Sequence, residues 1–407
     1  MVSDKLVKFT KKIAAYPMSL FFYLYISTFL IYLPSNPALT RSFRLLAVVG
    51  VFCVALSVSS MRKELFDNIK SFSGLTKLLV LIIIGAIVWS SLGPLSFDNR
   101  LFIGSSPEYL GTVTWLLFIG LGALFMKYVR LQLLSRGVAL VFVASIAVSL
   151  LANSFYISQG FRMAGVMFQP TTMGMYGIIA TLVSAYLLIK QTKPHVLFYV
   201  SFALSVLTVL LSQSRIAYVT LAVLLSVCSL YYFNKRKKMA LGAAAIVVFI
   251  AIIPQVSQNY FSRFQSDSVQ KGLTYRLDLY KVAGKDVLLN NPIKGNGPDS
   301  LPLAINNTNL VPEEIAKSLS LGWRFLSAHD LFFDMAYFFG CVAAIATLIL
   351  TALAIKQTSV HLTEKNLFLL MIFAVLLINA LFNVPSLELT SLYFVMMFGL
   401  LNHEKTA

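Results

Sequence analysis

The chain has 407 residues, of which 58% are hydrophobic and 12% are charged, and its mean hydropathy is +0.80. Because a soluble globular protein carries about 25% charged residues, this composition excludes an ordinary soluble domain and predicts a polytopic membrane protein. The net charge of +17 does not indicate nucleic-acid binding, since the cytoplasmic loops of membrane proteins are enriched in Lys and Arg.

Apolar runs long enough to cross a membrane occur twelve times, so we expect an all-α fold with about 12 transmembrane helices. The first run follows four lysines and has no small-residue cleavage site, which favours an anchor that stays in the protein. We expect transmembrane helices 1–9 within residues 1–256, a loop at 257–330 and transmembrane helices 10–12 within 331–407. The runs are 17–34, 43–60, 76–93, 110–127, 137–156, 171–190, 195–212, 215–233, 239–256, 331–355, 366–384 and 386–402.

The positions of the basic residues indicate how these spans are oriented. With the N-terminus inside, the inner segments hold 20 of the 33 Lys and Arg residues. The short outer loops hold five, which are Arg41, Arg44, Arg100, Arg162 and Arg215. The remaining eight lie in the long loop, which is too long to count in this comparison. The distribution predicts that both termini are cytoplasmic and that the long loop lies on the outer side.

Residues 258–334 form the long hydrophilic stretch of the chain. The spacing of apolar residues predicts an amphipathic helix over 274–289, which ends before Pro292. Gly295-Asn296-Gly297-Pro298 predicts a turn, and Val311-Pro312-Glu313-Glu314 predicts the start of another helix. A loop of this length with short helices of its own indicates a lid or a substrate platform.

Side chains that could carry out chemistry gather on the predicted outer side. His329 is the one histidine there, and its type of side chain can accept a proton at neutral pH. Asp330 and Asp334 are neighbours that could orient its ring. Arg162 and Arg215 are cations on the side that normally avoids them. A structural interpretation stays open for each, because an interfacial Arg or His can also contact lipid headgroups alone.

Other classes of site find less support. The three cysteines lie in apolar runs, and a single outer histidine gives no ligand spacing for a metal, so we expect neither a metal nor a cofactor. Composition leaves a Ser/His/Asp hydrolase open, but no GxSxG motif is present, and a P-loop is absent as well. Guanidinium groups suit phosphate recognition. A lipid that carries a pyrophosphate-linked sugar would therefore fit these residues. Its pyrophosphate linkage would supply the free energy for a transfer reaction.

Four patches, taken in their order along the chain, resemble the bacterial O-antigen ligases and the related O-antigen polymerases. The twelve-span layout with one large outer loop also fits, so the resemblance covers nearly the whole chain. Asp330 stands where this family usually has Asn, which leaves its role open. The patches are Arg162-Met163-Ala164-Gly165 with Gln169-Pro170, Ser212-Gln213-Ser214-Arg215-Ile216-Ala217, Arg276 with Asn291-Pro292-Ile293-Lys294-Gly295-Asn296-Gly297, and His329-Asp330-Leu331 with Gly340.

The resemblance implies a GT-C-like fold and an inverting, metal-independent transfer of a polysaccharide from undecaprenyl pyrophosphate to lipid A-core. It places this reaction at the periplasmic face of a bacterial inner membrane. Arg215 and Arg276 would bind the donor pyrophosphate, His329 would be the general base, and Arg162 and Gln169 would be further substrate contacts. The implied partners are the lipid-linked glycan donor, the lipid A-core acceptor and membrane lipids, without nucleic acid.

Two alternatives stay open. An O-antigen polymerase uses the same donor and similar motifs, although the well-developed outer loop before His329 favours a ligase. A transporter or flippase often has twelve spans as well. Transporters carry charges or broken helices near the membrane midplane, often in two related halves, whereas these runs are nearly free of charge and show no internal repeat.

Overall fold

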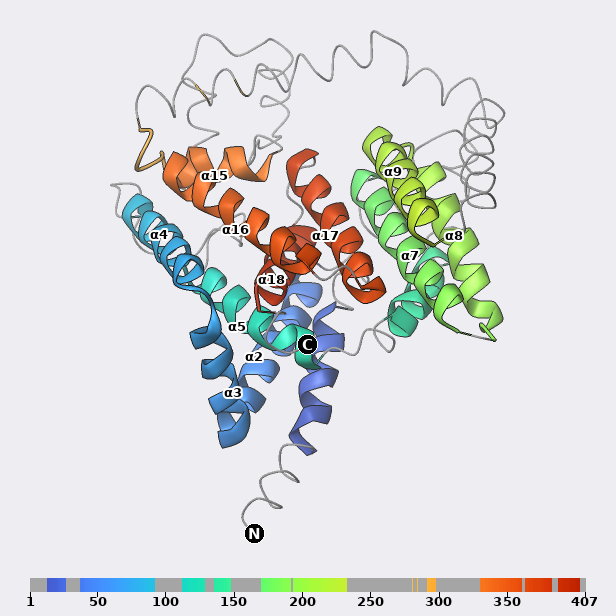
Figure 1. The fold of residues 1–407 in the computed structure, drawn as a ribbon, viewed down its shortest axis with the longest axis horizontal. Coiled ribbons are helices and arrows are strands. Elements are labelled where there is room, and N and C mark those ends of the chain that lie inside the picture. Colours follow the sequence, from blue (N-terminus) through green and yellow to red (C-terminus); the bar gives the residue numbers. More distant parts are fainter. Residues whose placement is uncertain are drawn as a thin grey trace. The chain divides into compact units, whose positions relative to one another are not determined.

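The computed structural model describes residues 13–26, 37–91, 112–128, 135–147, 170–191, 193–232, 280, 284, 291–297, 330–360, 363–382 and 387–402. In this part of the chain all regular structure is helical (Figure 1). The chain divides into two compact units, which are described separately. Unit 1 comprises Met1–Phe29, Pro37–Leu134 and Tyr275–Ala407, and unit 2 comprises Leu30–Asn36 and Ser135–Thr274.

The helices follow the predicted apolar runs closely. In unit 1 they are Ile13–Ile26, α2 (Pro37–Ser57), α3 (Ser59–Ser71), α4 (Gly74–Ser91), α5 (Thr112–Tyr128), α15 (Leu331–Phe339), α16 (Cys341–Val360), α17 (Glu364–Phe382) and α18 (Leu387–Leu400). In unit 2 they are Ser135–Ala147, α7 (Pro170–Lys190), α8 (Val196–Ser212) and α9 (Arg215–Tyr232). The run 239–256 and most of the long loop lie outside the described residues.

Two features differ from the expected layout. The run 331–355 is not one helix, because it breaks at Gly340 into α15 and α16. The second run is followed by α3, an unpredicted helix that bends by 105° from Ser42–Ser57. Three of the described helices are long and apolar enough to cross a membrane, or up to four if this bent pair counts as one span. Twelve spans therefore stay a prediction.

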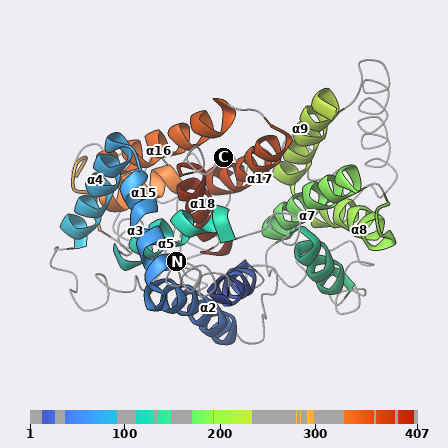
Figure 2. The same cartoon turned by 60° about the horizontal axis from the view of Figure 1, so that its bottom comes forward.

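In unit 2, α7 and α8 lie side by side (Figures 1 and 2) and are joined by hydroxyl groups. Thr181 Oγ1 donates to Ser205 Oγ at 2.9 Å, and Ser184 Oγ donates to Ser201 Oγ at 2.8 Å. A Cβ on Gly177 of α7 would come within 3.1 Å of the Ser205 carbonyl oxygen, so the two backbones approach closely. Small residues and hydroxyl contacts of this kind are typical of helix pairs within membranes.

Unit 1 is built around α18, which packs against α5, α16 and α17. Aromatic rings fill this contact: the ring centroids of Trp115 and Phe394 lie 4.5 Å apart, and those of Phe373 and Tyr393 lie 5.2 Å apart in a stacked arrangement. These four side chains are at most 1% exposed, and aromatic pairs contribute about 0.5–1.5 kcal/mol each beyond their buried area. Aromatic contacts therefore join α18 both to α5, which is far away in sequence, and to its neighbour α17.

Large apolar side chains are exposed along the outer helices of unit 1. Leu81 and Trp89 of α4 are 66% and 57% exposed, and Ile345 and Leu348 of α16 are also exposed. A row of such side chains on a single helix would be a liability in water, whereas it suits contact with lipid chains. The surface and the long apolar helices together indicate a membrane protein.

The close approach of α5 and α18 predicts opposite outcomes at two glycines. A Cβ on Gly122 would lie 2.8 Å from the Val395 carbonyl oxygen and 3.0 Å from the Gly399 nitrogen, whereas a Cβ on Gly85 of α4 meets nothing within 4 Å. We expect Gly122→Ala to lower the thermal unfolding temperature in detergent. Gly85→Ala should leave this temperature unchanged or raise it, because Ala is favoured over Gly in a helix by roughly 0.5–1 kcal/mol. Equal shifts in the two variants would contradict this packing.

Candidate functional site

Of the five expected site residues, the structure describes Arg215. Arg162, Gln169, Arg276 and His329 lie outside the described residues, so their positions and roles stay predictions. Two local structures can nevertheless be examined in detail. One is the corner between α8 and α9 in unit 2, which carries Arg215. The other is the start of α15 in unit 1, which follows His329 directly in the sequence.

The corner that carries Arg215 is a tight turn between two helices. Gln213 ends α8 in the left-handed conformation, with φ of 49°, and its backbone N–H donates to the Leu210 carbonyl oxygen at 3.1 Å. Arg215 is then the first residue of α9. The Tyr218 hydroxyl donates to the same Leu210 oxygen at 2.6 Å. The residue that ends α8 and the first turn of α9 are thus bonded to one carbonyl group. These bonds fix the point at which α9 begins, which is Arg215.

Packing against α7 holds this corner from the other side. A Cβ on Gly174 would lie 2.7 Å from Ser212 Oγ and 2.8 Å from the Cβ of Ala217, so only glycine leaves room for the turn. Ser212 and Ala217 are fully buried, and Ser214 is 1% exposed. The serines and the small residue of the Ser-Gln-Ser-Arg-Ile-Ala segment therefore have a packing role. Arg215, in contrast, is only partly buried.

The position of Arg215 is unfavourable for helix stability. A helix N-terminus carries a partial positive charge, and a cation in the first turn is disfavoured by about 0.3–1 kcal/mol. The first turn of α9 contains no acidic residue that would offset this charge. The N–H groups of Ala217 and Tyr218 are bonded to Ser214, so the guanidinium group is the part of this helix start that is suited to an anion. This arrangement can bind phosphate oxygens.

Asp330 caps the helix that follows His329 in the sequence. Its Oδ1 accepts hydrogen bonds from the backbone N–H groups of Phe332 at 2.9 Å and Phe333 at 3.0 Å, and its backbone is extended, as at a helix N-cap. Burial raises the pKa of the Asp330 carboxyl, and the two N–H groups oppose this shift. Asn caps helices as well as Asp does. The difference from the family pattern at this position therefore conserves the cap.

The segment Asn291–Gly297 lies against the break between α15 and α16, and we call this contact the glycine junction. The backbone N–H of Asn296 donates to the Tyr337 carbonyl oxygen at 2.8 Å, and that of Gly297 donates to the Phe338 oxygen at 3.0 Å. In return, the Pro292 oxygen accepts from the N–H of Cys341 at 2.8 Å. The last carbonyls of one helix and the first N–H of the next lack partners within a helix. The loop segment supplies them.

The glycines explain why the two backbones can meet. Gly340 has φ of 90° and Gly295 has φ of 70°, which side chains with a Cβ rarely adopt. A Cβ on Gly295 would lie 2.5 Å from the Phe338 oxygen, and one on Gly340 would collide with the Ile293 carbonyl group. The observed turn lies at 292–294 and is closed by the Gly295 N–H, which donates to the Asn291 carbonyl oxygen at 2.9 Å; it comes before the predicted turn at Gly295-Asn296-Gly297-Pro298, whose last residue lies outside the described residues. Sequence reasoning did not show that it docks on Gly340, although both belonged to the quoted patches.

Two polar side chains beside these structures belong to the four patches, but sequence reasoning assigned a role to neither. Gln213 is 7% exposed and is the non-glycine residue with positive φ among the described residues. Asn296 accepts a hydrogen bond from Asn291 Nδ2 at 2.8 Å, whereas its own Nδ2 is buried without a hydrogen-bond partner among the described residues. The backbone conformation of Gln213 and the burial of the Asn296 amide identify these residues. Residue type alone predicts neither property.

We predict that Asp330→Asn is tolerated and that Asp330→Ala is not. Asn keeps the N-cap, whereas Ala loses it at a cost of about 1 kcal/mol. Because the pKa of Asp330 is raised in the folded protein, the charged carboxyl lowers stability as the pH rises above about 4. Asp330→Asn should remove this part of the pH dependence. Thermal unfolding between pH 4 and 8 measures both effects, and equal losses in the two variants would contradict a capping role.

We predict that Gly340→Ala breaks the glycine junction. The new Cβ would meet the Ile293 carbonyl group, and φ of 90° is strained for Ala; strain in such regions costs roughly 1–3 kcal/mol. The unfolding temperature should fall clearly. Gly74→Ala is the matched control, because a Cβ there meets nothing within 4 Å. If the two variants unfold at the same temperature, the junction does not contribute to stability.

A comparison of the chain with known protein families gives a match that includes both of these local structures. Residues 200–349 match the O-antigen ligase family, a stretch that contains the Arg215 corner, the glycine junction and α15. Arg162 and Gln169 lie outside it. Among curated proteins, none matches the chain. The match supports an enzyme of the O-antigen ligase or polymerase type that acts on lipid-linked glycans. Residues 200–349 of this membrane protein are therefore similar to the O-antigen ligase family.

Proposed function

We propose that the protein is an O-antigen ligase that transfers an undecaprenyl-pyrophosphate-linked polysaccharide to a sugar hydroxyl of lipid A-core. The observation that carries this proposal is the match to the O-antigen ligase family over residues 200–349. This stretch contains Arg215, Arg276 and His329, the three residues to which the proposed mechanism gives direct roles. The reaction would take place at the periplasmic face of the inner membrane, where the positive charges predict the long loop to lie.

In the proposed reaction, His329 removes the proton from the acceptor hydroxyl as its oxygen attacks the anomeric carbon of the donor sugar. A new carbon–oxygen bond forms on one face, and the bond to the pyrophosphate oxygen breaks on the other, so the configuration inverts. The leaving undecaprenyl pyrophosphate takes the electron pair. Arg215 and Arg276 bind the charge that develops on it, in the way that fixed donors stabilise a transition state. Arg162 and Gln169 would be further contacts to substrate.

The geometry at Arg215 supports a role in binding the donor. The guanidinium group stands at the start of α9, on a turn that hydrogen bonds and close packing fix in place. A cation there is unfavourable for the helix alone, so a purely structural reason for it is weak. An anionic pyrophosphate would interact with the guanidinium group.

The capping of α15 next to the proposed base in the sequence supports the proposal. The N-cap and the glycine junction fix both ends of α15. His329 is the residue before the cap in the sequence and lies outside the described residues. A general base must lie within hydrogen-bond reach of the proton that it takes, and an ordered support of this kind serves that need.

An O-antigen polymerase is the second candidate, because the family match covers both types of enzyme at this level. The two differ in what accumulates when the gene is deleted. Loss of a ligase leaves full-length polymer on the lipid carrier and none on core. Loss of a polymerase leaves core that bears a single repeat. Analysis of lipopolysaccharide from a deletion strain separates these outcomes.

We predict that His329→Ala, Arg215→Ala and Arg276→Ala each abolish transfer while the protein remains in the membrane. A general base contributes about 10²–10⁴-fold to a rate, so the loss at His329 should be at least 100-fold. Arg215→Lys should not restore full activity, because an ammonium group cannot form the two-pronged contact. The measurement is complementation of a ligase-null strain with a matching core, with polymer on core read from gels.

Arg136→Ala is the matched control for Arg215→Ala. Arg136 also lies in the first turn of a helix in unit 2, but it is exposed and lies on the predicted cytoplasmic side. It should complement as well as the unchanged protein. Near-normal transfer by His329→Ala would remove the assignment of the base, and full complementation by Arg215→Ala would remove the donor-binding role of the corner.

A further inference from the structure

Helix α3 has no role in the proposed reaction, yet its two faces are sharply different. It follows α2 directly after a 105° bend at Val58. Its sequence, Ser-Ser-Met-Arg-Lys-Glu-Leu-Phe-Asp-Asn-Ile-Lys-Ser, is polar compared with the apolar helices before and after it. With α2 as the predicted span, a helix that turns away from it at this angle would run along the boundary between membrane and water.

The inner face of α3 is hydrogen-bonded to α5 and to the residue Asn402, which follows α18. Glu64 is buried and accepts a hydrogen bond from the Tyr128 hydroxyl at 3.1 Å. Asn68 Nδ2 donates to the Ala123 carbonyl oxygen at 2.8 Å, and Ser71 Oγ donates to Asn402 Oδ1 at 2.7 Å. These three contacts reach α5 and the end of α18. They fix which side of α3 faces outward.

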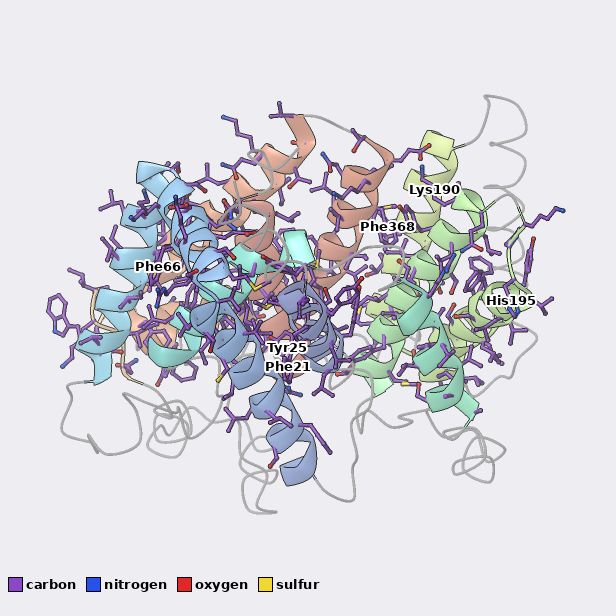
Figure 3. All side chains as sticks on the ribbon, turned by 90° about the horizontal axis from the view of Figure 1, so that it is seen from below. Phe21, Tyr25, Phe66, Lys190, His195 and Phe368 are labelled. Carbon is purple, nitrogen blue, oxygen red and sulfur yellow. The ribbon has the colours of Figure 1, made fainter. Side chains whose placement is uncertain are left out.

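The outer face of α3 carries three cations around one aromatic ring. Arg62, Lys63 and Lys70 are exposed, and Phe66 (labelled in Figure 3) is 49% exposed between them. Asp67 is the one acidic side chain exposed on this helix, because Glu64 is turned inward. The face therefore keeps an excess of positive charge, and a large apolar ring lies at its centre.

The cationic face continues into the start of α4. Lys77 is exposed and its Nζ donates to the Lys70 carbonyl oxygen at 2.6 Å, so its charge is held beside α3. Leu75 and Leu78, which flank it, are 50% and 54% exposed. Cations next to exposed apolar side chains are the combination that suits a surface with anionic headgroups above acyl chains.

We propose that the outer face of α3, formed by Arg62, Lys63, Phe66 and Lys70, binds the phosphate groups of anionic phospholipids. The cations pair with phosphodiester oxygens, and Phe66 inserts at the level of the headgroups, where aromatic rings are favoured. The positive charge, the exposed ring and the position at a bend after a span point to a lipid surface. An acidic protein would explain the charges but not their position next to exposed Leu75 and Leu78.

The test uses the full-length protein in a neutral detergent and measures its thermal unfolding while phosphatidylglycerol or phosphatidylcholine is added. Phosphatidylglycerol should raise the unfolding temperature more than phosphatidylcholine, and the extra shift should shrink as salt screens the charges. The triple variant Arg62→Gln/Lys63→Gln/Lys70→Gln should need at least about tenfold more phosphatidylglycerol for the same shift, since each cation near an anionic surface contributes to binding. Its unfolding temperature in phosphatidylcholine should not change, because these side chains are exposed.

The matched control removes the same charge from elsewhere. Lys193→Gln/Lys356→Gln/Lys365→Gln takes three exposed lysines from other helix ends and should keep the response to phosphatidylglycerol. An equal loss in both triple variants would show an effect of net charge and overturn the proposal. So would a full response in the α3 variant. If inorganic phosphate reproduces the shift, the face binds a free anion and not a lipid. Phe66→Gln should weaken the lipid response and leave any phosphate response unchanged.

Discussion

The glycine junction is the contact on which the candidate site in unit 1 depends. Breaking a helix within an apolar segment leaves backbone carbonyl and N–H groups without partners, and each such group costs several kcal/mol where water is scarce. Here Asn296, Gly297 and Pro292 supply the missing partners for Tyr337, Phe338 and Cys341. A segment about 45 residues earlier in the chain thus becomes part of the helix break. The positive φ values of Gly295 and Gly340 are what allow the two backbones to come this close.

Both ends of α15 have hydrogen-bond partners for their backbone groups. Its C-terminal carbonyls are bonded by the glycine junction, and its N-terminal N–H groups are bonded by Asp330. A helix of nine residues is short for independent stability, so partners at both ends and burial of Leu331 and Met335 are needed to hold it. The quoted patches around residues 291–297 and 329–340 then have one shared physical meaning. They build a short, fully capped helix that begins right after the predicted base.

The sequence predicted the helical class and the position of most helices, because long apolar runs leave few other structures possible. It did not predict the break at Gly340. Apolar residues continue through 331–355 on both sides of that glycine, and the partner that stabilises the break lies far away in sequence. Helix α3 was missed for a related reason. It is short and polar, and the hydrogen-bonded side chains of Glu64, Asn68 and Ser71 share its inner face with two buried apolar residues, Met61 and Leu65.

For the candidate site, the sequence identified the residue types, whereas the structure explains their setting. Arg215 was singled out as a cation on the wrong side of the membrane, and the structure adds that it opens a helix whose dipole also disfavours it. Two independent costs at one position are hard to reconcile with a structural role, particularly as the turn beneath it is held by Gly174, Ser212 and Tyr218 without any contribution from its charge. The corner would be at least as stable with a neutral side chain. We therefore propose that the guanidinium group serves a ligand from outside the chain, and the anionic end of a lipid-linked glycan would fit that role.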